Sequence, residues 1–332
     1  GFFDPKETQI IMRKRVGGPD FSQAPDLTNV SRFKESKLPS LKLRESVIFY
    51  PFNSKSNITM MANRSVHHAL ILHGESNKIS SCRPMARMYD FVFISGKTSQ
   101  DRYVENRIFT QSEVERGRLI MTGDTFIQTI DSIRSAGPAD QDPWILYAPT
   151  WENGSAAENY SSAEGGYGFD VAIRLAATLQ RKNIAIKLHP NFGKKDRSLI
   201  EVLRAKIAFM QKAGSRVLLL EPNLDFFTKV TFRAAFGSSL FASPMEPLPI
   251  EMALIDISGM EAICLKQGIP HIIVTKANSN IAVSEDIERK IYPFKTLKFL
   301  SDKSEIDTAI ERRLQQHFVD EAHKSIVFNY TI

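Results

Sequence analysis

Short, uninterrupted apolar runs recur along the chain, and each closes on Gly, Pro or a polar residue. Continuous runs of this kind are typical of strands that are covered on both faces, as in a parallel sheet. Segments with a helical period lie between them, notably 169–182 and 196–213. Strands that alternate with helices predict βαβ units. The expected strands are 46–52, 68–74, 91–96, 118–123, 144–150, 183–190, 216–222, 251–258 and 270–275.

Breaks in this rhythm suggest where domains begin and end. Residues 1–44 are polar and show no sustained period, which predicts an irregular N-terminal arm. The stretch "SAGPADQDP" (135–143) combines prolines, a glycine and aspartates, as linkers do. Further on, Ile306, Ile310, Leu314 and Phe318 recur every four residues, which predicts an amphipathic helix docked on the domains. We therefore expect an arm, two Rossmann-like domains that are doubly wound parallel sheets, and a C-terminal helix and tail, at 1–44, 45–140, 141–302 and 303–332.

Composition adds that the chain is an ordinary globular protein. It has 332 residues, of which 42% are hydrophobic and 24% charged, enough for about two domains. The net charge of +6 suits anionic partners without requiring them. No run is long and apolar enough to cross a membrane, and no signal-peptide core is present. Cys82 and Cys264 offer neither a disulfide framework nor metal-ligand spacing, so we expect a reducing, cytoplasmic environment.

The residues that close the strands are the candidates for chemistry, because ligands of open parallel sheets bind outside the carboxyl ends of the strands. In the first domain, "LHGESNK" places His73 at a strand end, followed by Gly74, Glu75 and Lys78. A neutral imidazole at this rim could take a proton from an attacking hydroxyl. A histidine that is hydrogen-bonded there for structural reasons would produce the same pattern.

The second domain shows polar residues at two further strand ends. In "IAIKLHP", Lys187 and His189 are two residues apart, so a strand would place both on one face, where they could hold a pyrophosphate. In "YAPTW", the hydroxyl of Thr150 could bind a phosphate oxygen, and the indole of Trp151 could wall a pocket. A turn that anchors a core tryptophan explains the second segment equally well.

A third strand end, "DISGMEA", leads directly into a short helix. Asp256 closes the strand, and the free amides of Ser258, Gly259 and Met260 would favour a phosphate. Ser258 with Glu261 also fits a capping box, which stabilises a helix without binding a ligand. Both interpretations are compatible, because the same amides serve both.

Metal binding is expected to play no part. The only Asp-x-Asp pattern, Asp140 to Asp142, lies in the Pro-flanked linker rather than at a strand end, so we expect no metal site and no cofactor. No nucleic-acid-binding motif is present. The Gly- and Ser-rich segment 152–168 predicts a mobile loop near the acceptor or an inert surface loop.

Taken together, "YAPTW", the basic-x-His-Pro strand end and Asp-x-Ser before a helix resemble the bacterial CDP-glycerol glycerophosphotransferases. "LHGESNK" resembles their His-Gly-x-x-x-Lys element, and "MTGDT" (121–125) resembles the Thr-Gly turn that ends their first domain. The resemblance runs from about Val66 to Val274. It implies a GT-B fold, in which two Rossmann-like domains face a cleft.

The resemblance also implies a reaction. An alditol phosphate, glycerol- or ribitol-phosphate, would pass without a metal from a CDP-linked donor to a hydroxyl of a polymer or lipid-linked primer. His73 would be the general base, with Gly74, Glu75 and Lys78 on the acceptor side. The chain would then work at the inner face of the bacterial plasma membrane, where a basic N-terminal arm suits an anionic surface. Donor contacts would come from His189, which we also expect to be catalytic, and from Thr150, Trp151, Lys187, Asp256, Ser258, Gly259, Met260 and Glu261.

Departures from the family pattern keep alternatives open. Lys187 stands where the family usually has Arg, "HGES" replaces His-Gly-Thr-Pro, and "DISGMEA" lacks the usual paired serines. A GT-B glycosyltransferase that moves a sugar from a CMP- or UDP-linked donor is the alternative enzyme. A phosphopolymer-binding module without chemistry is the third possibility, and the presence of both His73 and His189 argues against it.

Overall fold

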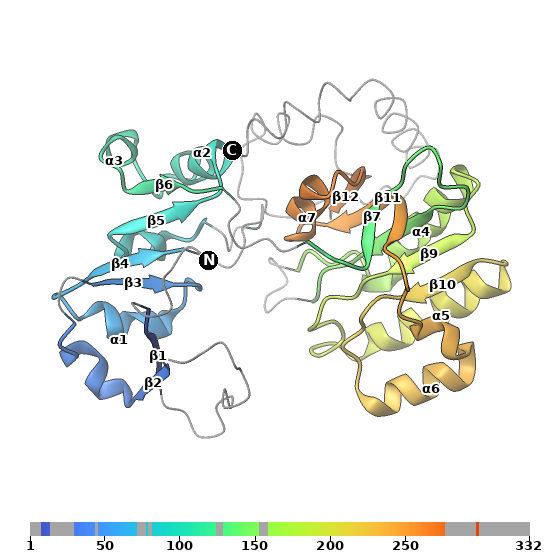
Figure 1. Ribbon diagram of the computed structural model, residues 1–332, viewed down its shortest axis with the longest axis horizontal. Helices are drawn as coiled ribbons and strands as arrows, with labels where there is room; N and C mark the ends of the chain where they lie inside the picture. The colour runs from blue at the N-terminus through green and yellow to red at the C-terminus, as the bar shows by residue number, and fades with distance from the viewer. Residues whose placement is uncertain are drawn as a thin grey trace.

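The computed structural model describes residues 8–13, 30–43, 46–71, 78, 82–123, 129–152, 159–275 and 297–298. Within these residues the chain is an α/β protein in which every strand pair is parallel. The strands form a four-stranded and a seven-stranded sheet, each in its own lobe of Figure 1, and a two-stranded sheet beside the first lobe. All the strands expected from apolar runs are present.

The first lobe is built on a sheet whose spatial order, β3-β4-β5-β6, is also the chain order. The expectation of a doubly wound sheet is therefore wrong for the described strands, because double winding requires the order to reverse. Apolar runs identify buried strands but carry no information on their order. The elements of this lobe are β3 (Val47–Tyr50), α1 (Ile58–Met61), β4 (His67–Leu70), β5 (Phe91–Ile94), α2 (Lys97–Glu105), α3 (Gln111–Glu115) and β6 (Leu119–Met121).

The N-terminal arm is more ordered than the sequence indicates. Strands β1 (Ile10–Arg13) and β2 (Val30–Phe33) pair in parallel, and a 3-10 helix at Glu35–Ser40 buries Leu38 in the core of the first lobe. The two strands are isolated in a segment that is otherwise polar and shows no repeating rhythm, so the prediction of an irregular arm fails here.

The second lobe has the strand order β10-β9-β8-β11-β12-β13, and β7 pairs with the first residues of β11. After β8, the next strands in the chain, β9 and β10, lie on one side of it, and β11, β12 and β13 lie on the other side. This is the strand order of dinucleotide-binding sheets. The topological switch point lies between β8 and β11. The strands are β7 (Ile133–Ser135), β8 (Trp144–Ala148), β9 (Asn183–Ile186), β10 (Arg216–Leu219), β11 (Leu248–Asp256), β12 (His271–Thr275) and β13 (Leu297–Lys298).

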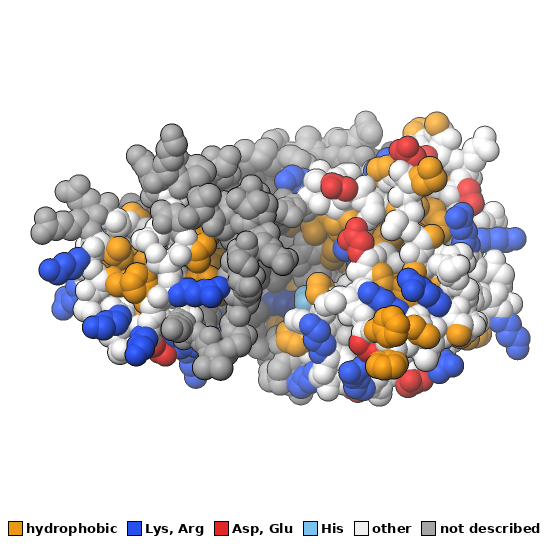
Figure 2. Space-filling model, turned by 60° about the horizontal axis from the view of Figure 1, so that its bottom comes forward, with side chains coloured by type: hydrophobic (Ala, Val, Ile, Leu, Met, Phe, Trp, Pro, Cys, Tyr) orange, Lys and Arg blue, Asp and Glu red, His pale blue; other side chains and the backbone are white. Residues whose placement is uncertain are grey.

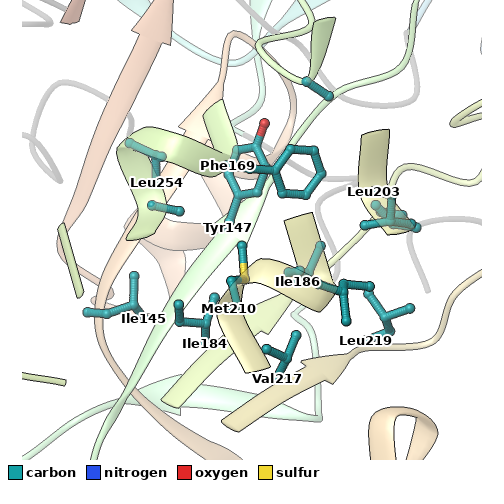
Figure 3. Packing of buried hydrophobic residues seen from close by; sticks show 14 of the residues in the cluster. Ile145, Tyr147, Phe169, Ile184, Ile186, Leu203, Met210, Val217, Leu219 and Leu254 are labelled. Carbon is teal, nitrogen blue, oxygen red and sulfur yellow. The ribbon is translucent and has the colours of Figure 1, made fainter. Parts of the chain in front are cut away.

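Side chains that alternate along these strands enter two separate cores, one on each face of the sheet. Ile145 and Tyr147 of β8 pack with the helices α4 and α5, whereas Trp144 and Leu146 pack on the face that carries α7. Figure 3 shows the first of these cores, with Tyr147 against Phe169 of α4. Two buried faces explain why the strands read as continuous apolar runs. The helices are α4 (Tyr167–Thr178), α5 (Ser198–Lys212), α6 (Phe226–Phe236) and α7 (Met260–Lys266).

The expected boundary at 140/141 does not match the packing. Strand β7 lies before that boundary, yet it pairs with β11, and Ile130 exchanges hydrogen bonds with Gln267 of the second lobe. The Pro- and Gly-rich stretch 135–143 is thus a connection between two strands of one sheet. Composition signals a break in regular structure, but it does not tell whether a domain ends there.

Cys82 and Cys264 are buried free thiols. Among the described residues, no helix is long and apolar enough to span a bilayer. On the face drawn in Figure 2, Lys and Arg side chains are spread over both lobes. The expected C-terminal helix, 303–326, lies outside the described residues.

Candidate functional site

The carboxyl ends of β8 and β11 are tied together at the switch point by Asp256. Its Oδ2 accepts hydrogen bonds from the backbone N–H groups of Thr150, at 2.7 Å, and Ser162, at 3.1 Å. The side chain is fully buried, and its Oδ1 has no hydrogen-bond partner among the described residues. Burial raises the pKa of Asp256 to about 7, although the bonds from Ser162 and Thr150 oppose the shift. Asp256 therefore fixes the backbone of Thr150 and Ser162 at the edge of the sheet.

Lys78 extends from the segment that follows β4, in the first lobe, to this rim. Its Nζ donates a hydrogen bond to Thr150 Oγ1 at 3.0 Å and lies 5.6 Å from the centre of the Tyr160 ring. Its charge lowers the pKa of both Asp256 and His189. The sequence assigns Lys78 to the acceptor side, and the structure places its ammonium among the residues expected to contact the donor.

His189 stacks on Trp151, with ring centres 5.8 Å apart and planes inclined by 18°. Its Nδ1 lies 3.1 Å from the backbone nitrogen of Asn191 and accepts that N–H, so the neutral ring carries its proton on Nε2. Burial, followed by the charge of Lys78, lowers the pKa of His189 to about 4. At neutral pH the imidazole thus offers a hydrogen-bond donor without a positive charge, and Lys78 supplies the charge.

Glu152 holds the turn that follows His189, and sequence reasoning missed it. The carboxylate is buried and accepts backbone N–H groups from Gly193 at 3.1 Å, Lys195 at 2.8 Å and Asp196 at 3.1 Å. A carboxylate that follows a strand end is a weak signal, because its partners lie some forty residues further on. Its bonds fix the backbone that carries the His189 ring.

Lys187 lies apart from this arrangement. The strand β9 ends at Ile186, so Lys187 and His189 follow the strand and the expected alternation does not apply. Lys187 Nζ is 3.4 Å from Glu221 Oε2, at the end of β10. The structure therefore does not show Lys187 and His189 converging on one point.

The start of α7 matches the expected strand-to-helix turn. Ser258 Oγ accepts the N–H of Met260 at 3.2 Å, and Gly259 is the exposed residue before the helix. Glu261 is buried, and its N–H bonds to the Ser258 carbonyl at 3.4 Å. The N-cap of α7 is Gly259, and no side chain caps the helix, so Ser258 is not the N-cap that the expected capping box requires.

The segment predicted to be a loop packs closely where it is described. Tyr160, Ser161 and Ser162 are buried, and Ser161 Oγ donates to the Thr150 carbonyl at 2.9 Å. The hydroxyls of Ser162 and Tyr147 lie 2.9 Å apart. These residues form the wall of the site next to Lys78. Gly and Ser in a sequence suggest mobility, but here their small size allows tight packing.

Part of the predicted site lies outside the described residues. His73, Gly74 and Glu75 lie outside them, so the assignment of His73 as a base stays a prediction. Asp140 forms a bidentate pair with Arg134, at 2.8 and 2.7 Å. In the described part of the chain, no cluster of three or more His, Cys, Asp or Glu side chains could hold a metal ion.

A separate cleft of about 450 Å³ opens beside the end of β10. It shares Glu221 with the Lys187 ion pair, and none of the residues expected to contact the donor lines it. Lys229 and Arg233 of α6 line it together with Asp131, so both signs of charge are present.

The sequence matches no family model, and no curated protein matches it significantly. Two solved structures are similar to the chain, and their descriptions name trehalose-6-phosphate synthase and trehalose-6-phosphate. One, of a trehalose-6-phosphate synthase studied with bisubstrate glycomimetics, is 11% identical with a TM-score of 0.42, covering 84% of this chain and 68% of that chain. The other, described as trehalose-6-phosphate from E. coli bound with UDP-2-fluoro glucose, is 12% identical with a TM-score of 0.42, covering 84% and 67%. At this level the similarity identifies no family.

Proposed function

We propose that this chain is a transferase of the GT-B type that moves a glycosyl group from a nucleotide-linked donor to a hydroxyl acceptor. The observation that carries the proposal is the contact between Lys78 and Thr150, which brings a cation from the first lobe to the switch point of the second sheet. Switch points of open parallel sheets are where nucleotides bind. A donor with a diphosphate or phosphate requires the kind of cation that Lys78 supplies.

In this proposal the donor phosphates lie at the rim formed by Lys78, Thr150 and His189. Lys78 provides the charge, and His189 provides a neutral N–H donor from Nε2. Interactions of this kind stabilise the negative charge that develops on a departing nucleotide. The segment Ser258 to Glu261 and the ring of Trp151 are proposed to contact the rest of the donor.

The acceptor is proposed to approach from the first lobe, with His73 as the base that removes its proton. Transfer from a UDP-sugar would form a bond from the acceptor oxygen to the sugar carbon and release UDP. A CMP-sugar would release CMP in the same way. In both cases the acceptor proton passes to the base.

Transfer of an alditol phosphate from a CDP-linked donor is the second candidate. The observation that favours it is that Lys78, which closes the His-Gly-x-x-x-Lys element, contacts the threonine of "YAPTW", so two of the motifs that resemble the glycerophosphotransferases meet. This reaction would join the acceptor oxygen to the donor phosphorus and release CMP. The product would contain a phosphodiester, and the acceptor would be a polymer or a lipid-linked primer.

A nucleotide screen followed by product analysis tests both candidates. We expect CMP, CDP or UDP to raise the unfolding temperature of the full chain and to bind in calorimetry, with GDP as the control. Activated donors of the preferred nucleotide are then incubated with acceptors and followed by phosphorus NMR. A new phosphodiester signal in the acceptor supports alditol-phosphate transfer, and release of the nucleotide without phosphorus in the acceptor supports glycosyl transfer. If no nucleotide binds, the proposal is wrong.

A further inference from the structure

Helix α6 presents aromatic side chains to solvent at its first turn. The exposed fractions are 73% for Phe226, 79% for Phe227 and 44% for Val230. Monomeric soluble proteins rarely leave adjacent large apolar side chains this exposed, so a cluster of them indicates a surface that another molecule covers.

The apolar character of α6 runs along its outer side as well as its inner side. At 100° per residue, Phe226, Val230, Ala234 and Phe227 fall within one arc of about 100°. All four are exposed, whereas Phe232 is buried in the core of the second lobe. The inward residues hold the helix in place, and the residues of the outward arc are not part of that core.

Basic side chains border this outer arc on one side. Lys229 and Arg233 are one turn apart on the same helix and lie next to Phe226 on the helical wheel. The acid nearest in sequence, Asp225, caps the helix by accepting the Thr228 N–H at 3.0 Å, and it also pairs with Arg197 at 3.1 Å. Figure 2, which brings the underside of Figure 1 forward, shows hydrophobic side chains gathered among Lys and Arg on the second lobe.

We propose that the outer arc of α6, with Phe226, Phe227 and Val230 flanked by Lys229 and Arg233, docks the protein on an anionic lipid bilayer. Phenylalanines that project from a helix beside basic residues are suited to the interface, where the rings enter the boundary of the acyl chains and the cations meet lipid phosphates. This inference does not depend on the proposed function.

Vesicle flotation of the full chain tests the proposal. We expect binding to vesicles of phosphatidylcholine mixed with phosphatidylglycerol, and binding at least about tenfold weaker to phosphatidylcholine alone, because each basic residue near an anionic surface contributes about 1 kcal/mol. The double variant Phe226→Ser/Phe227→Ser should bind the anionic vesicles at least about tenfold more weakly, since it removes two inserted rings. Phe52→Ser is the matched control, since Phe52 is 55% exposed in the first lobe, and its variant should bind like the wild type.

Two further measurements check that the variants are folded and that the α6 surface itself contacts the lipid. Unfolding curves of the variants should match those of the wild type, because the changed rings are exposed. In a Phe227→Trp variant, tryptophan emission should shift to shorter wavelength on anionic vesicles. Absence of wild-type binding, or equal binding by the double variant, would overturn the proposal. So would a wild-type dimer that the double variant dissociates without any effect of lipid, because the arc would then contact a second copy of the chain.

Discussion

Asp256 and His189 lie at the same edge of the second sheet, and the protein shifts both toward their neutral forms. Burial raises the pKa of Asp256 to about 7 and lowers that of His189 to about 4. Desolvation penalises the charged form of each group, which raises the pKa of an acid and lowers that of a base. Lys78 lowers both values, and the carboxylate of Glu152 opposes it at His189. The two shifted groups therefore lie beside a cation and a buried carboxylate.

The pKa of Asp256 predicts a pH-dependent stability. The folded state binds a proton more tightly than the unfolded state, so the contribution of Asp256 is fully present below the unfolded pKa of 3.8 and is lost as the pH rises through about 7. The free energy of unfolding of the wild type, relative to Asp256→Asn, should therefore decrease between pH 4 and 7, by up to about 1.4 kcal/mol per pH unit. Urea unfolding of both proteins across this range measures the difference. A difference that does not change with pH would contradict the shift.

His189 predicts the opposite trend. Its folded pKa is depressed, so its contribution is fully present above the unfolded pKa of 6.5 and is lost as the pH falls through about 4. The stability of the wild type relative to His189→Gln should then increase from pH 4 to 6.5. The same urea series provides the measurement, and an NMR titration of the imidazole checks the pKa directly. A midpoint near 6.5 would show that the ring is not desolvated.

Lys78 and Lys187 provide a matched pair for locating the phosphate-binding cation. Lys78→Met should weaken nucleotide binding about tenfold or more, because it removes a charged hydrogen-bond donor from the switch point. It should also raise the pKa of His189 above about 4, since Lys78 is a cause of the depression. Lys187→Met should leave that pKa unchanged and affect nucleotide binding less, because Lys187 pairs with Glu221. Calorimetry and imidazole NMR measure both quantities, and equal losses of affinity would place the cations at one site.

These results show which features the sequence could predict. The strands were recognisable because Tyr147 and its neighbours are buried on both faces of the sheet, which leaves a continuous apolar run. The strand Ile133–Ser135 was not, because Ile133 is its single apolar residue and no apolar run marks it. Helix α6 was missed for a different reason. Phe226, Phe227 and Val230 face solvent, so the helix lacks the alternation of apolar and polar sides that marks an amphipathic helix.

The edge at which the candidate residues lie could be predicted, but their contacts could not. Strand-end reasoning led to Thr150, His189 and Asp256, because carboxyl ends of parallel strands share one edge. It could not show that Asp256 is fully buried, or that Lys187 points to Glu221. Both depend on where side chains point after the strand ends, and the spacing of residues does not determine that direction. Glu152 was missed because its partners are distant in sequence.

Glu152 is expected to be a positioning residue. Glu152→Ala would leave the N–H groups of Gly193, Lys195 and Asp196 without their acceptor, and we expect a loss of about 3 kcal/mol in the free energy of unfolding. Glu152→Gln keeps one acceptor oxygen and should lose less stability. Because the carboxylate raises the pKa of His189, both variants should lower that pKa further.

The control for Glu152 is Glu221→Gln. Glu221 is an exposed acid whose ion pair with Lys187 spans 3.4 Å, and exposed pairs contribute less than about 1 kcal/mol. Denaturant unfolding and imidazole NMR on the three variants separate the two roles. A Glu152→Gln variant with wild-type imidazole titration would limit Glu152 to stability alone.

Gly168 tests the close approach of α4 to the site. A Cβ at this position would lie 2.1 Å from Tyr147 Oη and 2.2 Å from Ser162 Oγ, and those two hydroxyls are hydrogen-bonded to each other. Gly168→Ala should therefore destabilise the fold by about 1–3 kcal/mol, the usual cost of overpacking a core. It should also disturb the Ser162 backbone, whose N–H binds Asp256. Gly137→Ala is the control, because the nearest atom to its Cβ, Asp140 Oδ2, is 3.9 Å away. Thermal and urea unfolding of both variants and the wild type measure the effect. If Gly168→Ala were as stable as the wild type, α4 could move away from β8 without cost. Tyr147 and Ser162 would then not hold the wall of the site in place.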